Sequence, residues 1–143
     1  MTLSLKIAAL GIEHRHIIGM AAQMINVGAD FTGWWNDGTP PGQVAFEKRF
    51  PDTPRFKDKA RLLADPDIDL VLIADIPNRR AALAIEAMEA GKDVMVDKPG
   101  CTTLEQLAAI QDCQARTGRI WSVNFSERFE VASVTKAAEL VQS

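Results

Sequence analysis

The hydrophobic positions form short apolar runs that alternate with segments of helical periodicity. Continuous apolar runs predict strands at 6–10, 31–35, 69–74, 93–96 and 119–125, and a weaker run predicts a brief strand at 53–56. Apolar residues at helical spacing predict helices at 17–27, 43–50, 58–64, 77–90, 102–116 and 131–141. Two adjacent tryptophans, Trp34 and Trp35, must point to opposite faces of their strand, so one of them packs under a helix on each side.

Residues at the segment ends agree with these boundaries. Gly28, Gly91 and Gly118 follow predicted helices, where a residue of positive φ commonly ends a helix. The run Thr102 to Glu105 matches a capping box that opens the helix ending at Arg116.

The strict alternation of strand and helix indicates the α/β class. Strands joined by helical crossovers form a parallel sheet covered on both faces. We therefore expect a doubly wound parallel sheet of the Rossmann type, with three layers in the order α/β/α and one domain over 1–143. In such a sheet a ligand lies in the crevice outside the carboxyl ends of the strands, where the strand order reverses.

Composition narrows the function classes. The chain has 143 residues, 47% of them hydrophobic, and a net charge of −3, which provides no electrostatic drive toward nucleic acid or an anionic membrane. No apolar run approaches the roughly 20 residues of a membrane helix, and the first residues lack the pattern of a secretory signal. Two cysteines make neither a disulfide framework nor a zinc cluster, so a cytoplasmic location is expected.

The turn after the first strand departs from the pattern that holds a pyrophosphate. That pattern is G-x-G-x-x-G, and the sequence offers Gly11-Ile12-Glu13-His14-Arg15-His16. Gly11 matches the first glycine, whereas Glu13 and His16 replace the second and third. Three interpretations remain open: a modified phosphate or substrate loop, a solvated polar turn, or a metal site formed by Glu13, His14 and His16. The metal interpretation lacks a distant partner, so we predict no metal site.

An acidic residue usually follows the second strand and binds the adenosine ribose. Asn36 and Asp37 occupy that place, and both are also ordinary turn residues.

The end of the fifth predicted strand carries a family resemblance. Asp97-Lys98-Pro99, after the run Ala90 to Val94, resembles the E-K-P motif of the Gfo/Idh/MocA oxidoreductases. Residues 63–69 are similar to the family's sequence before its fourth strand, residues 76–78 to its T-P-N turn, and residues 123–129 to the end of its sixth strand. The resemblance spans nearly all of the chain.

The resemblance implies NAD or NADP as cofactor and Lys98 as the catalytic residue that positions or polarises the reacting oxygen. A cis peptide bond before Pro99 would fix the direction of the lysine; the alternative is a surface Lys-Pro turn. The expected cofactor-binding residues are Gly11, Ile12, Glu13, His14, His16, Asn36, Asp37, Ala74, Ile76, Pro77, Asn78, Asp97, Lys98 and Arg128. Arg79 and Arg80 stand where relatives often have histidine. One interpretation is that they contact phosphate or an acidic substrate; the other is that they solvate the start of a helix. Arg128 alternatively pairs with Glu127 or Glu130.

The resemblance also implies a small-molecule substrate of the sugar or polyol type and hydride transfer. Family members continue into a C-terminal α/β substrate domain, which is absent from these 143 residues, so we expect little turnover from this chain alone. The alternative is a Rossmann-like binding or interaction module that has lost dinucleotide binding. Uncovered apolar surface is also compatible with a homo-oligomer.

Overall fold

The computed structural model describes residues 4–127 and 131–142. The strands are β1 (Lys6–Leu10), β2 (Asp30–Trp35), β3 (Leu70–Ile73), β4 (Asp93–Asp97) and β5 (Trp121–Asn124). The helices are α1 (His16–Asn26), α2 (Gln43–Arg49), α3 (Lys59–Ala64), η1 (Pro77–Arg79), α4 (Arg80–Glu89), α5 (Leu104–Thr117) and α7 (Ala132–Gln142). The strands form one parallel sheet in the order β2-β1-β3-β4-β5, which confirms a doubly wound α/β fold.

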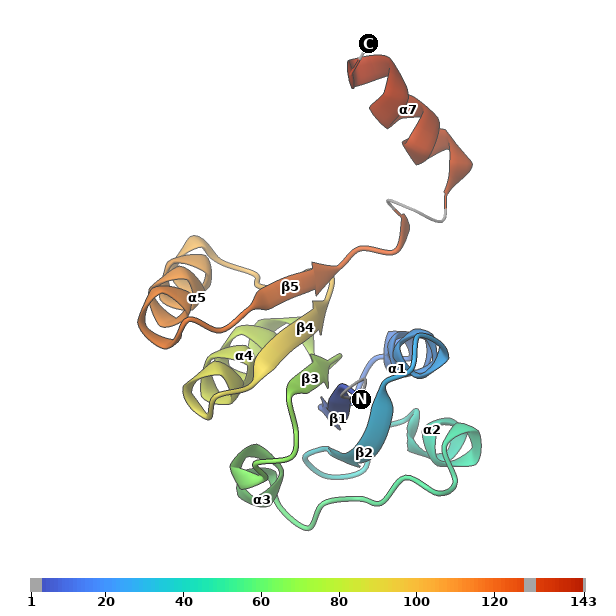
Figure 1. Cartoon of the computed structure of the whole chain (residues 1–143), viewed down its shortest axis with the longest axis vertical. Helices are drawn as coiled ribbons and strands as arrows, with labels where there is room; N and C mark the ends of the chain where they lie inside the picture. The colour runs from blue at the N-terminus through green and yellow to red at the C-terminus, as the bar shows by residue number, and fades with distance from the viewer. Residues whose placement is uncertain (1–3, 128–130, 143) are drawn as a thin grey trace.

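Helices cover both faces of the sheet, as expected for three layers (Figure 1). One buried cluster joins α1 and α2 to the sheet, and the other joins α3, α4 and α5 to the opposite face. Trp34 lies in the first cluster and Trp35 packs against the second, which confirms that they point to opposite faces. Helix α7 stands away from the layers, and no helix in the described part of the chain is long and apolar enough to cross a membrane.

The strand predicted at 53–56 is wrong. This segment makes a single parallel bridge, between Arg55 and Trp34. The Trp34 N–H donates to the Pro54 carbonyl at 3.1 Å, and the Phe56 N–H donates to the Trp34 carbonyl at 2.7 Å. Pro54 itself has no N–H to donate, so a regular ladder cannot extend through it. The sheet therefore has five strands and not six.

The capping box predicted from Thr102 is shifted by one residue. Thr103 caps α5, and its hydroxyl accepts from the Gln106 N–H at 3.1 Å. The Gln106 side chain in turn accepts from the Thr102 N–H at 2.8 Å. Gln106 therefore makes the side-chain hydrogen bond of the capping box that was expected of Glu105, because the helix begins one residue later than predicted.

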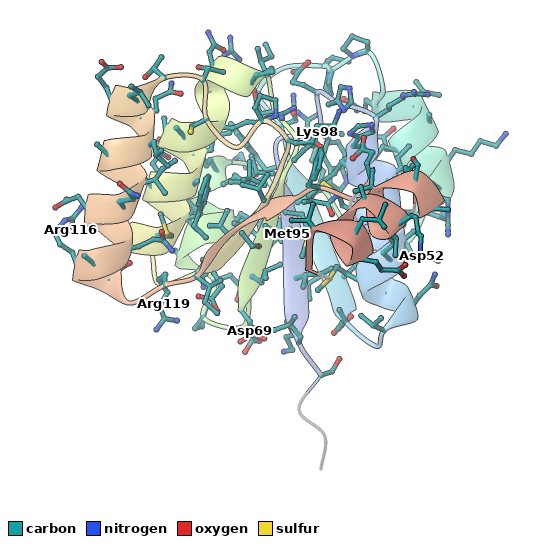
Figure 2. All side chains as sticks on the ribbon, turned by 90° about the horizontal axis from the view of Figure 1, so that it is seen from above. Asp52, Asp69, Met95, Lys98, Arg116 and Arg119 are labelled. Carbon is teal, nitrogen blue, oxygen red and sulfur yellow. The ribbon has the colours of Figure 1, made fainter. Side chains whose placement is uncertain are left out.

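All five strands point the same way, so the residues after them share one edge of the sheet. Figure 2 shows Lys98 at this carboxyl edge and Asp69 and Arg119 at the opposite one. The strand order reverses between β1 and β3, so the crevice expected from the topology lies outside the ends of these two strands. The predicted site residues in the described part of the chain lie at this carboxyl edge, in the turns after β1, β2, β3 and β4 or in the strand and helix ends that border those turns.

Candidate functional site

Gly11 allows the turn after β1 to pass close to the end of β3. Its φ is +89°, a conformation that L side chains rarely adopt. A Cβ at this position would lie 2.8 Å from both Cβ and Oδ2 of Asp75. The Gly11 N–H donates to the Trp35 carbonyl at 2.8 Å, and the Ala74 N–H donates to the Gly11 carbonyl at 3.1 Å. The first glycine of the turn is therefore required for steric reasons.

Asn36 braces this turn from the end of β2. Its buried side chain accepts from the Ile12 N–H at 2.7 Å through Oδ1 and donates to Glu13 Oε1 at 3.0 Å through Nδ2. Glu13, which replaces the second glycine, thus has its carboxylate held toward β2. Asp37, the next residue after Asn36, is exposed and lines a pocket.

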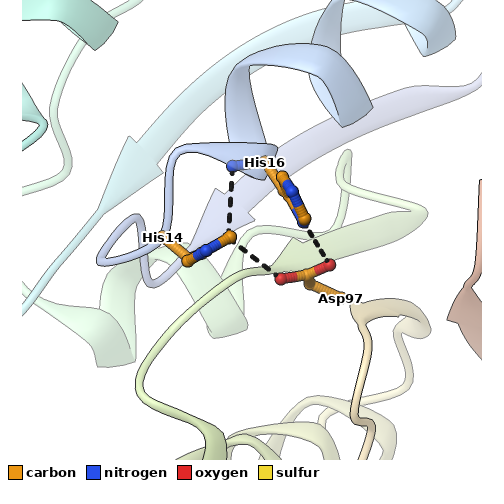
Figure 3. A group of neighbouring side chains, drawn as sticks. All are labelled: His14, His16 and Asp97. Atoms are coloured by element: carbon orange, nitrogen blue, oxygen red, sulfur yellow. Dashed lines mark hydrogen bonds and ion pairs between the residues drawn. The ribbon is translucent and has the colours of Figure 1, made fainter.

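The two histidines converge on one buried carboxylate (Figure 3). His14 Nδ1 lies 3.3 Å from Asp97 Oδ2, and His16 Nδ1 lies 3.0 Å from Asp97 Oδ1. The His14 ring meets the His16 ring edge-on, with centroids 4.2 Å apart. The sequence-based expectation that these histidines lack a distant partner is therefore wrong. The partner is Asp97, at the end of β4, whereas Glu13 lies with Asn36.

Arg80 fixes the backbone that carries Lys98. Its side chain is buried and donates to the carbonyls of Asp97, Lys98 and Pro99 at 2.9, 2.7 and 3.2 Å. It also donates to the Asp75 carbonyl at 2.7 Å and to Asp97 Oδ2 at 3.1 Å. The expectation that Arg80 contacts a ligand or solvates the helix start is wrong, because its donors are used inside the protein.

Burial and neighbouring charges shift three of the ionisable groups at this edge. Burial lowers the pKa of Arg80, against the opposing attraction of Asp97. Burial raises the pKa of Asp75, although the Ile76 N–H donates to its carboxylate at 2.6 Å. Desolvation and the neighbouring His16 lower the pKa of His14, against the attraction of Asp97. His14 therefore favours the neutral imidazole more strongly than a free histidine does.

Lys98 projects from the clamped segment toward solvent. The Lys98–Pro99 peptide bond is cis, as the sequence analysis expected. The side chain is 41% exposed, and its Nζ lies 3.7 Å from Glu127 Oε1, also at the carboxyl edge. This loose exposed pair leaves the ammonium able to donate to another acceptor.

Two hollows flank the turn after β1. One, of about 480 Å³, lies between α1 and the end of β5 and is lined by Arg15, His16, Ile18, Gly19, Met20, Gln23, Asn124 and Ser126. The other, of about 340 Å³, lies between the ends of β2 and β3 and is lined by Trp35, Asp37, Lys59, Asp75, Asn78, Arg79, Ala82 and Leu83. Arg79 thus faces a hollow, unlike Arg80.

The remaining predicted residues are close by. The His14 N–H donates to the Ala74 carbonyl at 2.7 Å, which ties the β1 turn to the end of β3. Ile76 and Pro77 are exposed at the start of η1, and the Asn78 carbonyl accepts from Gln106 at 3.1 Å. Arg128 lies outside the described residues.

Comparison with known proteins assigns the chain to a family. Residues 13–125 match the Gfo/Idh/MocA family, described as an oxidoreductase family with an NAD-binding Rossmann fold. The chain belongs to the Gfo/Idh/MocA family. This membership confirms the resemblance seen in the sequence and the expectation of a nicotinamide dinucleotide cofactor.

Three relatives illustrate the similarity within the Gfo/Idh/MocA family. A protein from Erwinia carotovora atroseptica SCRI1043, described as an oxidoreductase, superimposes with a TM-score of 0.90 at 41% identity, over 97% of this chain and 41% of that one. Inositol 2-dehydrogenase of Acidothermus cellulolyticus is 29% identical over 92% of this chain and 38% of its own length. The 1-carboxy-3-chloro-3,4-dihydroxycyclohexa-1,5-diene dehydrogenase of Comamonas testosteroni is 32% identical over 76% and 27% respectively. The chain thus spans less than half the length of the relatives it matches.

Sequence reasoning missed Asp75 and gave Arg80 the wrong role. Arg80 shares a helical face with the buried residues Ala84 and Ala87, at spacings of four and seven, and a charged residue in that register signals a buried pair. Asp75 directly follows a buried strand and precedes a proline-initiated helix, a position that pointed to the same edge.

Proposed function

We propose that this chain is the cofactor-binding half of an NAD-dependent dehydrogenase acting on a sugar, polyol or related hydroxy compound. The observation that carries the proposal is Lys98, presented at the carboxyl edge on a backbone clamped by buried Arg80. The dehydrogenase relatives, an inositol 2-dehydrogenase among them, support a polyhydroxylated substrate.

The residues present fit a dinucleotide. The first turn of α1 contains no acidic residue, so the positive end of its dipole is not offset by a carboxylate in that turn and favours a pyrophosphate. The Glu13 carboxylate, which would repel phosphate, is held toward β2 by Asn36. The hollow beside Asp37 suits the adenosine half, and the hollow beside α1 and the end of β5 suits the nicotinamide half.

The bound nicotinamide would supply the hydride acceptor or donor. Lys98 is the residue of this chain that we assign to the reacting oxygen. Its ammonium can donate a charge-assisted hydrogen bond that favours the alkoxide-like character of a hydroxyl losing its proton. Glu127 Oε1, 3.7 Å from the ammonium, is the partner that a substrate oxygen would replace.

A second domain would complete the substrate pocket, so we propose that residues 1–143 bind cofactor but turn over little. The second candidate function is an interaction module without a cofactor. The presence of Glu13 in place of a glycine favours it, and helix α7, which stands apart from the layers, offers a surface for association.

Cofactor titration separates these two candidates. We expect NADH fluorescence to change on binding to the chain; a chain that binds neither NADH nor NADPH would exclude the dehydrogenase proposal.

The role of Lys98 needs a separate comparison in a longer chain that carries a second domain. Lys98→Ala should lower turnover far more than cofactor affinity, whereas Lys48→Ala, at an exposed position on α2, should change neither. Equal losses of turnover and affinity in Lys98→Ala would instead indicate a structural lysine.

A further inference from the structure

We infer that His14, His16 and Asp97 form a binding site for one divalent transition cation of the zinc class. The sequence contains only two histidines, and both lie on the same buried carboxylate. One ligand atom from each of the three residues lies within 4.8 Å of the others. The ligands come from two elements that are 81 residues apart, the turn after β1 and the end of β4.

The separations fit a small cation. Zinc binds imidazole nitrogen and carboxylate oxygen at about 2.0–2.2 Å, so two tetrahedral ligand atoms stand about 3.3 Å apart. His14 Nδ1 lies 3.3 Å from Asp97 Oδ2 and His16 Nδ1 lies 3.0 Å from Asp97 Oδ1, and one ligand atom from each residue lies within 4.8 Å of the others. Both nitrogen–oxygen pairs are near the tetrahedral spacing, and a cation held by one carboxylate oxygen would draw the more widely separated ligand atoms together.

His14 Nδ1 has conflicting neighbours that a cation would reconcile. It accepts from the His16 N–H at 3.4 Å and also faces Asp97 Oδ2 at 3.3 Å. A neutral ring nitrogen that accepts from an N–H carries no hydrogen to give to a carboxylate. A cation bound to the single lone pair of Nδ1 would join the ring nitrogen to the carboxylate, in place of the long hydrogen bond from the His16 N–H.

A second shell is already in place around the carboxylate. Arg80 donates to Asp97 Oδ2 at 3.1 Å and to the Asp97 carbonyl at 2.9 Å, which fixes the carboxylate orientation. Metal-binding carboxylates are typically held by such outer partners. Arg80 balances the charge of Asp97, and the other two ligands are imidazoles, which favour zinc, cobalt or nickel over magnesium or calcium.

The site would be an open one. Three protein ligands leave at least one position of a tetrahedral cation for an outside oxygen, the arrangement seen in zinc sites that accept a small ligand. His14 and His16 are 45% and 35% exposed, whereas Asp97 is buried, so the free position faces solvent.

Ring resonances of the two histidines test the site directly. The metal-free chain is titrated with Zn²⁺ and followed by ¹H–¹⁵N correlation of the imidazoles, which needs no variant and no NAD. We expect both rings to shift together and to saturate at one equivalent. A shift of one ring alone, or of neither at that ratio, would refute the site.

Variants and Co²⁺ absorption give the second measurement. His14→Ala and His16→Ala should each weaken Co²⁺ binding by at least roughly tenfold, the loss expected even for removal of an outer partner of a ligand. The matched control, Cys101→Ala/Cys113→Ala, removes both thiols and should leave the affinity unchanged. Loss of binding in the thiol-free variant, or full binding in either histidine variant, would overturn the inference. These titrations contain no NAD, and because His14, His16 and Asp97 are also expected cofactor-binding residues, cofactor binding is judged only from the NADH titration of the unaltered chain.

Discussion

Removing the Arg80 side chain should destabilise the protein strongly. In Arg80→Met the aliphatic volume is kept, but Asp97 loses its buried cation and the Asp75 and Lys98 carbonyls lose short hydrogen bonds of 2.7 Å. Breaking a buried ion pair by removing one partner costs about 3–5 kcal/mol. Total stability of a domain is about 5–15 kcal/mol, so this single change would remove a large share of it.

Urea denaturation followed by circular dichroism measures the free energy of unfolding of each variant. The matched control is Arg79→Met, because Arg79 precedes Arg80 directly but is exposed; it should cost less than about 0.5 kcal/mol. In the Arg80→Met background, Asp97→Asn should recover part of the loss, since no uncompensated charge then remains buried. A cost below about 1 kcal/mol for Arg80→Met would refute this account of the buried pair.

Two further predictions concern the acidic residues of the carboxyl edge. The pKa of Asp75 is raised above 3.8 by burial, so the folded state holds this proton more tightly than the unfolded state, and stability falls as pH rises through the window above 3.8. Asp75→Asn should therefore raise the free energy of unfolding more at pH 7 than at pH 4 in urea titrations; an equal effect at both values would contradict the assignment. Asp37 lines the hollow assigned to adenosine, so NADH should bind more tightly than NADPH. In fluorescence titrations, Asp37→Ser should reduce the ratio of NADH affinity to NADPH affinity by about tenfold or more, because a hydrogen bond to a charged acceptor is lost. An unchanged affinity ratio would exclude Asp37 as the ribose ligand.

The order of elements could be predicted from the sequence because it depends on local periodicity. Because side chains alternate along a strand, the sequence predicted that Trp34 and Trp35 point to opposite faces of the sheet. The buried strand β3 was likewise predicted from its continuous apolar run. The prediction of a strand at 53–56 was wrong because Pro54 has no N–H to donate. The segment therefore makes one bridge, with Trp34, and no regular ladder.

The site could be located but not assembled from the sequence. Strand ends predicted that the residues near Gly11 and Lys98 share one edge, which the structure confirms. The contact between His16 and Asp97 spans 81 residues and depends on how β1 and β4 are placed around β3, so no local pattern contains it. Arg80 was misjudged for a related reason: its helical spacing indicates burial, but it does not identify the partners, which are the Asp97 carboxylate and backbone carbonyls such as those of Asp97 and Lys98.

Because of the single bridge at Arg55, the β2 edge of the sheet is less able to pair with another strand than the β5 edge. Segment 53–56 occupies the outer side of β2 at Trp34, and Phe56 lies so close to Gly33 that a Cβ there would be 2.4 Å from its ring. An exposed row of unpaired N–H and C=O groups invites edge-to-edge aggregation, and a short irregular cover is one way to block it. Among the described residues β5 pairs on one side only, with β4. An added strand would therefore extend the sheet at β5, the strand that leads toward Glu127.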